Sequence, residues 1–146
     1  MSKKPLIFKK AVKIRFSDID RYQHVNTIYY PDYVYTSRFE FIEEKFGIAP
    51  NFFEKEGVGF YTVRFESRFE KSIPASASYV QVISQVNEVD RALVKIGFKI
   101  TDPSEQLVYS SGGFEFYVID LATQKPFKAV PESFEKILFE IKTEES

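Results

Sequence analysis

The stretch from residue 92 to residue 100, "ALVKIGFKI", constrains the fold more than any other part of the chain. Apolar residues occupy every second position in it, namely Ala92, Val94, Ile96, Phe98 and Ile100. This period is typical of a strand with one buried face and one solvated face. Turn signals flank the strand, "NEVD" at 87–90 and "DPSE" at 102–105. Strands joined by such short connections pair antiparallel, so we expect an antiparallel sheet.

Four other segments carry strand patterns, at residues 12–16, 61–69, 79–86 and 107–119. The chain is also 17% aromatic, with 16 Phe and 9 Tyr, and aromatic residues favour strands. Gly112 and Gly113 lie inside the last segment. Paired glycines there predict a bulge or a close approach of another backbone.

Residues 26–46 follow a helical period instead. Positions four, three and four residues apart carry Tyr30, Val34, Ser37 and Phe41. This spacing places them on one narrow face of a long helix. Asn26 or Thr27 can cap its start. Gly47, followed shortly by Pro50, ends it.

The order of the elements is one strand, a long helix and then four strands. Short helices are also expected at 51–56 and, ending at Ile141, at 131–141. A helix beside an antiparallel sheet is an α+β arrangement, here expected as a single domain over residues 1–146. Two such sheets could join at their edges in a dimer and so hide an edge strand.

Composition excludes several classes of function. The formal net charge is −1 and the basic residues do not cluster, so we expect no nucleic-acid partner. The chain has no Cys, which excludes disulfides, thiolate metal sites and a cysteine nucleophile. The apolar run in "MSKKPLIFKKAV" is too short for a signal peptide or a membrane span. We therefore expect a cytoplasmic protein that does not enter a membrane.

The segment "SDIDRYQHVN", residues 17–26, is the candidate site, because it holds the only histidine of the chain. Asp18, Asp20 and His24 follow a strand and precede the long helix. A carboxylate can act as a base or nucleophile, and an imidazole can orient or protonate a partner. The N–H groups at a helix start can stabilise an oxyanion. Such a cluster would serve acyl transfer.

Two other interpretations of the same segment remain open from local physics. The aspartates can be solvated turn residues, with His24 as a structural hydrogen-bonding residue. Asp18, Asp20 and His24 also offer three potential metal ligands, but no second histidine or acidic cluster supports them. We therefore expect no metal.

A longer segment, "FSDIDRYQHVNTIYYPDYVYTSRFEF", resembles the signature of hot-dog-fold acyl-CoA thioesterases of the 4-hydroxybenzoyl-CoA thioesterase type. The matching residues are Asp18, Asp20, His24, Val25, Asn26, Tyr30 and Arg38. "QHVN" is also similar to the motif of plant acyl-ACP thioesterases. The resemblance covers nearly the whole chain. It implies a hot-dog fold, in which a curved antiparallel five-stranded sheet wraps a long helix.

The resemblance also implies roles for individual residues. Asp20 aligns with the catalytic carboxylate, which acts as a nucleophile or as the base for water. His24 aligns with the histidine beside it, and the backbone N–H of Thr27 aligns with the oxyanion donor. Tyr30 is expected either to pack in the core or to line the pocket. Asp18 is expected to hold the loop. No cofactor is implied.

The segment departs from the family pattern at four positions, which are Tyr22, Gln23, Thr27 and Tyr35. Gln23 replaces the glycine of the bacterial pattern but is normal in the plant one. Tyr22 stands where the plant enzymes carry a functional Asn, and Tyr35 stands where many bacterial relatives have Glu. The pair Asp20 and His24 matches both patterns.

Basic residues outside the motif are candidate phosphate ligands. Arg64, Arg68 and Lys71 could meet the phosphates of coenzyme A, since Arg and Lys bind phosphate well. The alternative is that they form the solvated face of the second strand. Arg38 is expected to be structural and paired with a carboxylate.

The sequence therefore predicts a thioesterase that acts on acyl-CoA or acyl-carrier-protein substrates as a homodimer or homotetramer. Two alternatives stay open. One is a non-catalytic hot-dog module that binds an acyl thioester. The other is an enoyl-thioester hydratase or dehydratase, which uses an acid and a histidine in different surroundings.

Overall fold

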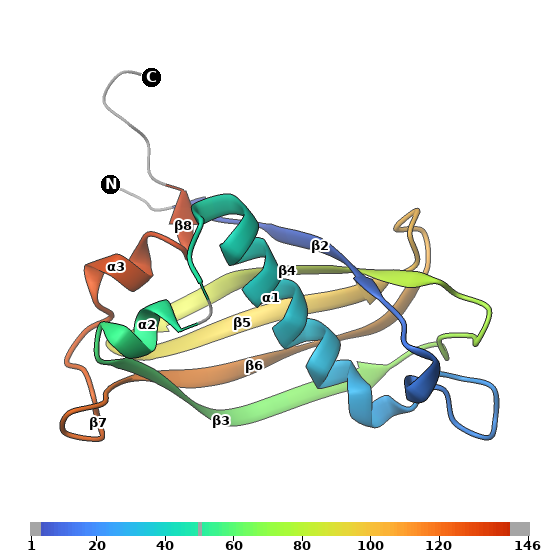
Figure 1. Cartoon of the computed structure of the whole chain (residues 1–146), viewed down its shortest axis with the longest axis horizontal. Helices are drawn as coiled ribbons and strands as arrows, with labels where there is room; N and C mark the ends of the chain where they lie inside the picture. Colours follow the sequence, from blue (N-terminus) through green and yellow to red (C-terminus); the bar gives the residue numbers. More distant parts are fainter. Residues whose placement is uncertain (1–3, 50, 141–146) are drawn as a thin grey trace, which may run out of the picture.

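A computed structural model describes residues 4–49 and 51–140 of the chain (Figure 1). The strands are β1 (Lys4–Pro5), β2 (Phe8–Lys13), β3 (Val58–Phe69), β4 (Tyr79–Asp90), β5 (Leu93–Thr101), β6 (Val108–Asp120), β7 (Lys125–Pro126) and β8 (Phe139–Glu140). The helices are α1 (Tyr30–Phe46), α2 (Phe52–Lys55) and α3 (Glu132–Glu135), with single 3-10 turns η1 (Phe16–Asp18) and η2 (Thr27–Tyr29).

The main sheet is antiparallel, with the five long strands in the order β2-β4-β5-β6-β3. The short β7 extends it by pairing with β6, and β1 pairs separately with β8. The sheet curls around α1, which crosses its inner face (Figure 1). The α+β class and the hot-dog arrangement are therefore confirmed.

The long helix buries the face that its spacing predicts. Tyr30, Val34 and Ser37 are buried, and Phe41 stacks on Phe8 of β2 with ring centroids 4.4 Å apart. Arg38 is buried as well, so the covered face is wider and less apolar than expected. Helix α1 ends where Gly47 adopts a left-handed φ of 67°, which glycine reaches without strain.

The predicted turn at "NEVD" is wrong. Strand β4 runs on to Asp90, and the chain reverses at Arg91, which has a φ of 57°. A bulge between Val86 and Glu88 absorbs the extra residue and keeps both halves of β4 in register with β5. Glu88 then forms an ion pair with Lys95 of β5, at 2.9 Å. Residues that are typical of turns are therefore accommodated inside a paired strand.

Other boundaries shift by a few residues. The first strand ends at Lys13, and its predicted continuation forms η1 instead. The helix expected at 51–56 is α2. The helix expected at 131–141 is only the four residues of α3, and Ile141 lies outside the described residues. Among the helices of the described residues, none is long and apolar enough to cross a membrane.

The glycine pair in β6 marks a close backbone approach, as predicted. A Cβ on Gly112 would lie 2.0 Å from the carbonyl oxygen of Glu66, and one on Gly113 would lie 2.8 Å from that of Ile96. The register shift of the β3–β6 pair lies elsewhere, between Thr62 and Arg64. The glycines therefore allow neighbouring backbones to come together.

Gly112→Ala should destabilise the protein by about 1–3 kcal/mol, because the added methyl group meets fixed backbone and not a side chain that can turn away. Gly97→Ala is the matched control, since the atoms nearest to its Cβ would belong to the side chain of Asn87. Urea denaturation of both variants measures the difference. Equal losses of unfolding free energy would contradict this account of Gly112.

Candidate functional site

The loop between η1 and η2 brings Asp20 and His24 together. The backbone N–H of Asp20 donates to the carbonyl of His24 at 2.9 Å, and the N–H of Gln23 donates back to the carbonyl of Asp20 at 3.1 Å. Gln23 closes this narrow turn with a φ of 66°. A pair separated by four positions in the sequence is thus a pair of neighbours in space.

A second segment, which follows β3, holds this loop in place. The N–H of Val25 donates to the carbonyl of Ile73 at 2.9 Å, and the N–H of Ala75 donates to the carbonyl of Gln23 at 3.0 Å. The site is therefore built from two loops that are about 50 residues apart in the sequence.

Asp18 fixes the start of the loop, as expected. Its buried carboxylate accepts hydrogen bonds from the hydroxyl of Tyr33 at 2.7 Å and from Nε of Arg15 at 3.1 Å. Its carbonyl accepts from the N–H of Asn26 at 2.8 Å. Burial alone would raise the pKa of Asp18, but the hydrogen bonds from Tyr33 and Arg15 outweigh it and lower the pKa. Asp18 is therefore an ionised anchor.

The start of the helical segment leaves one backbone donor available. Asn26 caps η2, because its Oδ1 accepts from the N–H of Ile28 at 3.1 Å. The N–H of Thr27 donates to no described residue. The residue whose N–H was expected to stabilise an oxyanion thus has that N–H free.

A cavity of about 300 Å³ gathers most of the predicted site residues. Its lining consists of Asp20, Tyr22, His24, Val25, Thr27, Tyr30, Phe69, Glu70, Lys71 and Ser72. We call it the Asp20 pocket. Tyr30 is both buried and part of this lining, in edge contact with Phe69 at 5.2 Å between ring centroids. The two roles weighed for Tyr30 are therefore compatible.

The two candidate catalytic side chains are not linked by a hydrogen bond among the described residues. Asp20 is half-buried, and its Oδ1 accepts from the N–H of Tyr22 at 2.8 Å. Its Oδ2 accepts from no described residue. His24 is exposed beside it. The carboxylate thus keeps one oxygen available for chemistry.

The other predicted phosphate ligands do not share this location. Lys71 lines the Asp20 pocket, but Arg64 and Arg68 do not. Arg64 is exposed on β3 and forms ion pairs with Glu66 and, at 3.5 Å, with Glu115. Arg68 is exposed near the end of the same strand.

Residues that the sequence did not identify complete the pocket. Phe69 is the last residue of β3 and Glu70 and Ser72 follow it, and only the three-dimensional pairing of the two loops brings them to the site. Tyr22 lies at the rim, exposed, with the guanidinium carbon of Arg21 5.0 Å from its ring centroid. Tyr35 does not reach the pocket and packs instead against Phe114 of β6.

No cluster of three or more His, Asp or Glu side chains that could hold a metal ion occurs within residues 4–49 and 51–140.

Comparison with known proteins assigns most of the chain to one family. A family model described as the thioesterase-like superfamily matches residues 14–138. No curated protein sequence matches the chain significantly.

Several solved structures share the fold at low sequence identity. A DHNA-CoA thioesterase from Staphylococcus aureus aligns with a TM-score of 0.73 and 20% identity, covering 84% of this chain and 80% of that one. A probable thioesterase from Escherichia coli gives 0.69 and 22%, covering 82% and 88%. Another Staphylococcus aureus protein, solved in complex with CoA, gives 0.76 and 15%, covering 94% and 84%.

Asp18→Asn should lower the unfolding free energy at neutral pH by about 1.5–3 kcal/mol, because it weakens charge-assisted hydrogen bonds. Since the folded-state pKa of Asp18 lies below its ordinary value, this stabilisation is complete above about pH 4 and is lost as the pH falls further. Urea denaturation between neutral and acidic pH should therefore show the two proteins converging in acid.

Asp32→Asn is the matched control, since Asp32 pairs with the same Arg15 from a partly exposed position. Its effect should be much smaller at every pH. A difference between Asp18→Asn and the parent protein that does not change with pH would contradict the anchoring role.

Proposed function

The chain belongs to the thioesterase-like superfamily, and on that premise we propose that it hydrolyses acyl thioesters at the Asp20 pocket. One observation carries the proposal. Asp20, which keeps an available carboxylate oxygen, His24, and Thr27, which has a free N–H, all line a single cavity. These are a carboxylate, a proton carrier and an oxyanion donor, which acyl transfer requires together.

The reaction would proceed by one of two routes from Asp20. As a nucleophile, the carboxylate forms a bond to the thioester carbon, the C–S bond breaks, and water then hydrolyses the resulting anhydride. As a base, the carboxylate takes a proton from water while the water oxygen attacks the same carbon. In both routes the N–H of Thr27 would stabilise the oxyanion, and His24 would deliver a proton to the departing thiolate.

The carrier of the acyl group would be coenzyme A or the phosphopantetheine arm of a carrier protein. Lys71 is the best-placed cation, because it lines the Asp20 pocket and forms no ion pair with a described residue. Arg64 is already engaged by Glu66 and Glu115, so it is a weaker candidate. Arg68 lies on the same strand and could meet a phosphate further from the pocket.

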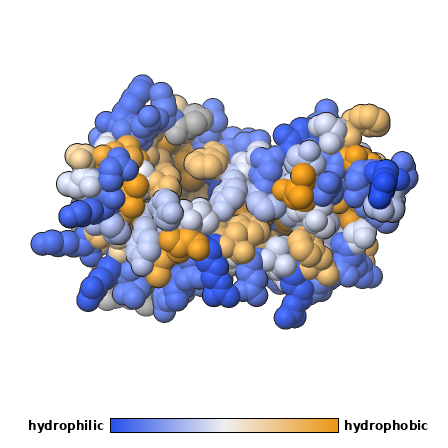
Figure 2. Space-filling view, turned by 90° about the horizontal axis from the view of Figure 1, so that it is seen from below, coloured by the Kyte–Doolittle hydropathy of each residue, from blue (hydrophilic) through white to orange (hydrophobic). Residues whose placement is uncertain are grey.

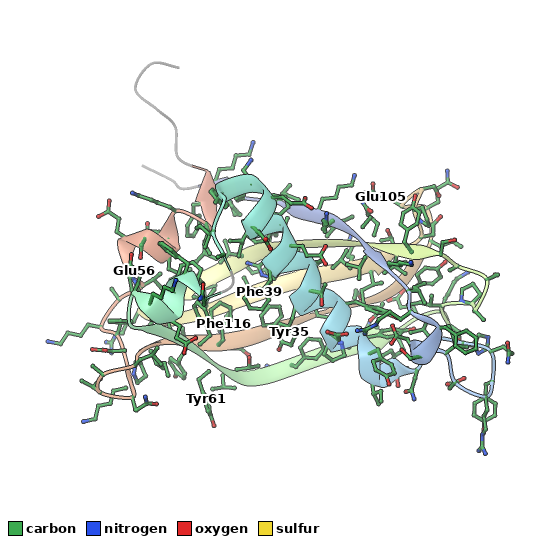
Figure 3. All side chains as sticks on the ribbon, in the orientation of Figure 1. Tyr35, Phe39, Glu56, Tyr61, Glu105 and Phe116 are labelled. Carbon is green, nitrogen blue, oxygen red and sulfur yellow. The ribbon has the colours of Figure 1, made fainter. Side chains whose placement is uncertain are left out.

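We also propose a homodimer formed through β3, which could associate further into a tetramer. The long strands at the two edges of the main sheet are β2 and β3. Lysines protect β2, at positions 9, 10 and 13, whereas β3 exposes Tyr61, Val63 and Phe69. Figure 2 shows the underside of the molecule, where hydrophobic surface lies among hydrophilic residues, and Figure 3 shows Tyr61 projecting from β3. Antiparallel pairing of two β3 edges would cover this surface.

A non-catalytic binding module is the second candidate. It is favoured by one observation, which is that no hydrogen bond joins the described side chains of Asp20 and His24. This alternative predicts saturable binding of acyl-CoA without turnover. A hydratase would instead remove the ultraviolet absorbance of an enoyl-CoA.

Asp20→Asn should reduce the turnover of acyl-CoA substrates by about 100- to 10,000-fold, because the amide is neither a base nor a nucleophile. The measurement is thiol release from a panel of acyl-CoAs. Asp90→Asn is the matched control, since Asp90 is an exposed aspartate at the end of β4. Unchanged turnover in folded Asp20→Asn would exclude Asp20 as the catalytic group.

Val63→Lys should convert the dimer to a monomer. Val63 lies near the middle of β3, so pairing of two copies would place the new lysines and both Arg64 side chains close together. Sedimentation velocity measures the mass in solution. Leu107→Lys, at an exposed apolar residue outside β3, should leave the mass unchanged. A monomeric parent protein, or a dimeric Val63→Lys variant, would contradict the proposed interface.

A further inference from the structure

A second cavity, of about 370 Å³, lies between α1 and the strands β3 and β6, away from the Asp20 pocket. Its wall is largely aromatic, with ring centroids of Phe53, Phe60, Phe116 and Phe134 lying 5.0–5.9 Å apart where they are in contact. Figure 3 shows Tyr35 and Phe39 on α1 and Phe116 on the sheet beside it. An apolar body of modest size fits such a wall.

One charged side chain, Arg38, lines this cavity. The residue is 7% exposed. Its Nη1 donates to the hydroxyl of Ser84 at 2.9 Å, and its guanidinium carbon lies 4.0 Å from the ring centroid of Phe8. Its Nε and Nη2 groups donate to no described residue. Neither nitrogen is completely enclosed by the described protein atoms. These two groups retain donor capacity, and Arg38 belongs to the lining of the cavity.

Arg38 also lacks a counter-charge. Within the described part of the chain, no carboxylate oxygen forms an ion pair with its guanidinium, contrary to the expected pairing. Burial lowers the pKa of Arg38 to about 9, which still leaves the group charged at neutral pH. Buried charges in proteins are normally paired, so an unpaired one in the lining of a cavity indicates that a ligand supplies the anion.

We propose that this cavity binds an acyl group that ends in a carboxylate, and that Arg38 pairs with that carboxylate. A planar guanidinium donates two parallel hydrogen bonds to a carboxylate, and the aromatic wall takes the apolar body between the two ends. A neutral acceptor such as a hydroxyl would leave the charge of Arg38 unbalanced. The class of substrate is therefore a dicarboxylic acid with one carboxyl group in thioester linkage.

This assignment rests on the proposed thioesterase function and dimer. The Asp20 pocket borders Phe69 at one end of β3, and the second cavity borders Phe60 at the other end. Antiparallel pairing of two β3 edges places the Phe60 end of one copy beside the Phe69 end of its partner. A thioester carbonyl at one copy's Asp20 would then direct its acyl group into the cavity of the other copy.

Hydrolysis of matched substrates tests the assignment. Adipoyl-CoA and hexanoyl-CoA have the same chain length and differ in the terminal carboxylate. The parent protein should favour adipoyl-CoA in kcat/KM, and Arg38→Met should reduce that preference by about 10- to 100-fold, because charge-assisted hydrogen bonds are lost. The loss should fall on adipoyl-CoA more than on hexanoyl-CoA, since Met keeps the apolar stem.

Controls separate charge, shape and folding. Lys45→Met removes a cation from the exposed side of the same helix and should leave the preference unchanged. Arg38→Lys keeps the charge without the planar fork, so its preference should be intermediate. Thermal melting should show Arg38→Met as stable as the parent, because an apolar replacement removes an unpaired buried charge. If Arg38→Met does not fold, Arg38→Lys carries the test.

Direct binding distinguishes failure of this inference from failure of the proposed function. Saturation-transfer NMR with free adipate and hexanoate requires no turnover. Adipate binding that depends on Arg38, in a protein that hydrolyses no acyl-CoA, would support the carboxylate site and overturn the thioesterase. The protein could instead hydrolyse acyl-CoAs without preferring adipoyl-CoA or 4-carboxybenzoyl-CoA over their uncharged counterparts. If Arg38→Met then gave the same ratios of kcat/KM as the parent, the carboxylate site alone would be overturned.

Discussion

The carboxylate of Asp18 is the interaction on which the geometry of the site depends. Asp18 joins three parts of the chain, because its carboxylate accepts from Arg15 before η1 and from Tyr33 in α1, while its backbone carbonyl accepts from Asn26. The loop that carries Asp20 is thus closed at its base. A buried ionised carboxylate requires such partners, since desolvation alone would neutralise it. Asp20, the second aspartate of the motif, can then remain half-buried, with one carboxylate oxygen free for chemistry.

Local pattern was sufficient to predict most of the fold. The alternation in β5 and the spacing in α1 each reflect burial of one face, and both elements occur where the pattern places them. Pattern failed where pairing overrides propensity. Residues 87–90 resemble a turn, yet a bulge and the contact between Glu88 and Lys95 keep them in a strand. The sequence of those four residues alone predicts neither the bulge nor the partner strand.

The residues predicted from the motif line one cavity, whereas the rest of that lining was not predicted. Asp20, His24 and Thr27 lie within one short segment, so their approach to one cavity follows from one turn and one cap. Phe69 and its neighbours reach the same cavity through hydrogen bonds between distant loops, which sequence spacing does not encode. Arg38 was also expected to be structural and paired with a carboxylate, and the described residues provide no such partner.

The proposed dimer interface and the two cavities discussed above all border one strand, β3. Strand β3 exposes apolar side chains at an unpaired edge, the Asp20 pocket borders its Phe69 end, and the Arg38 cavity borders its Phe60 end. The exposed edge and the unpaired Arg38 are unfavourable for an isolated chain, since exposed edges aggregate and unpaired buried charge is destabilising. They are compatible with stability if a second chain covers the edge and a ligand supplies the anion. Dimer formation would then cover the exposed edge of β3, and ligand binding would neutralise the charge of Arg38. Both events would take place beside the same strand.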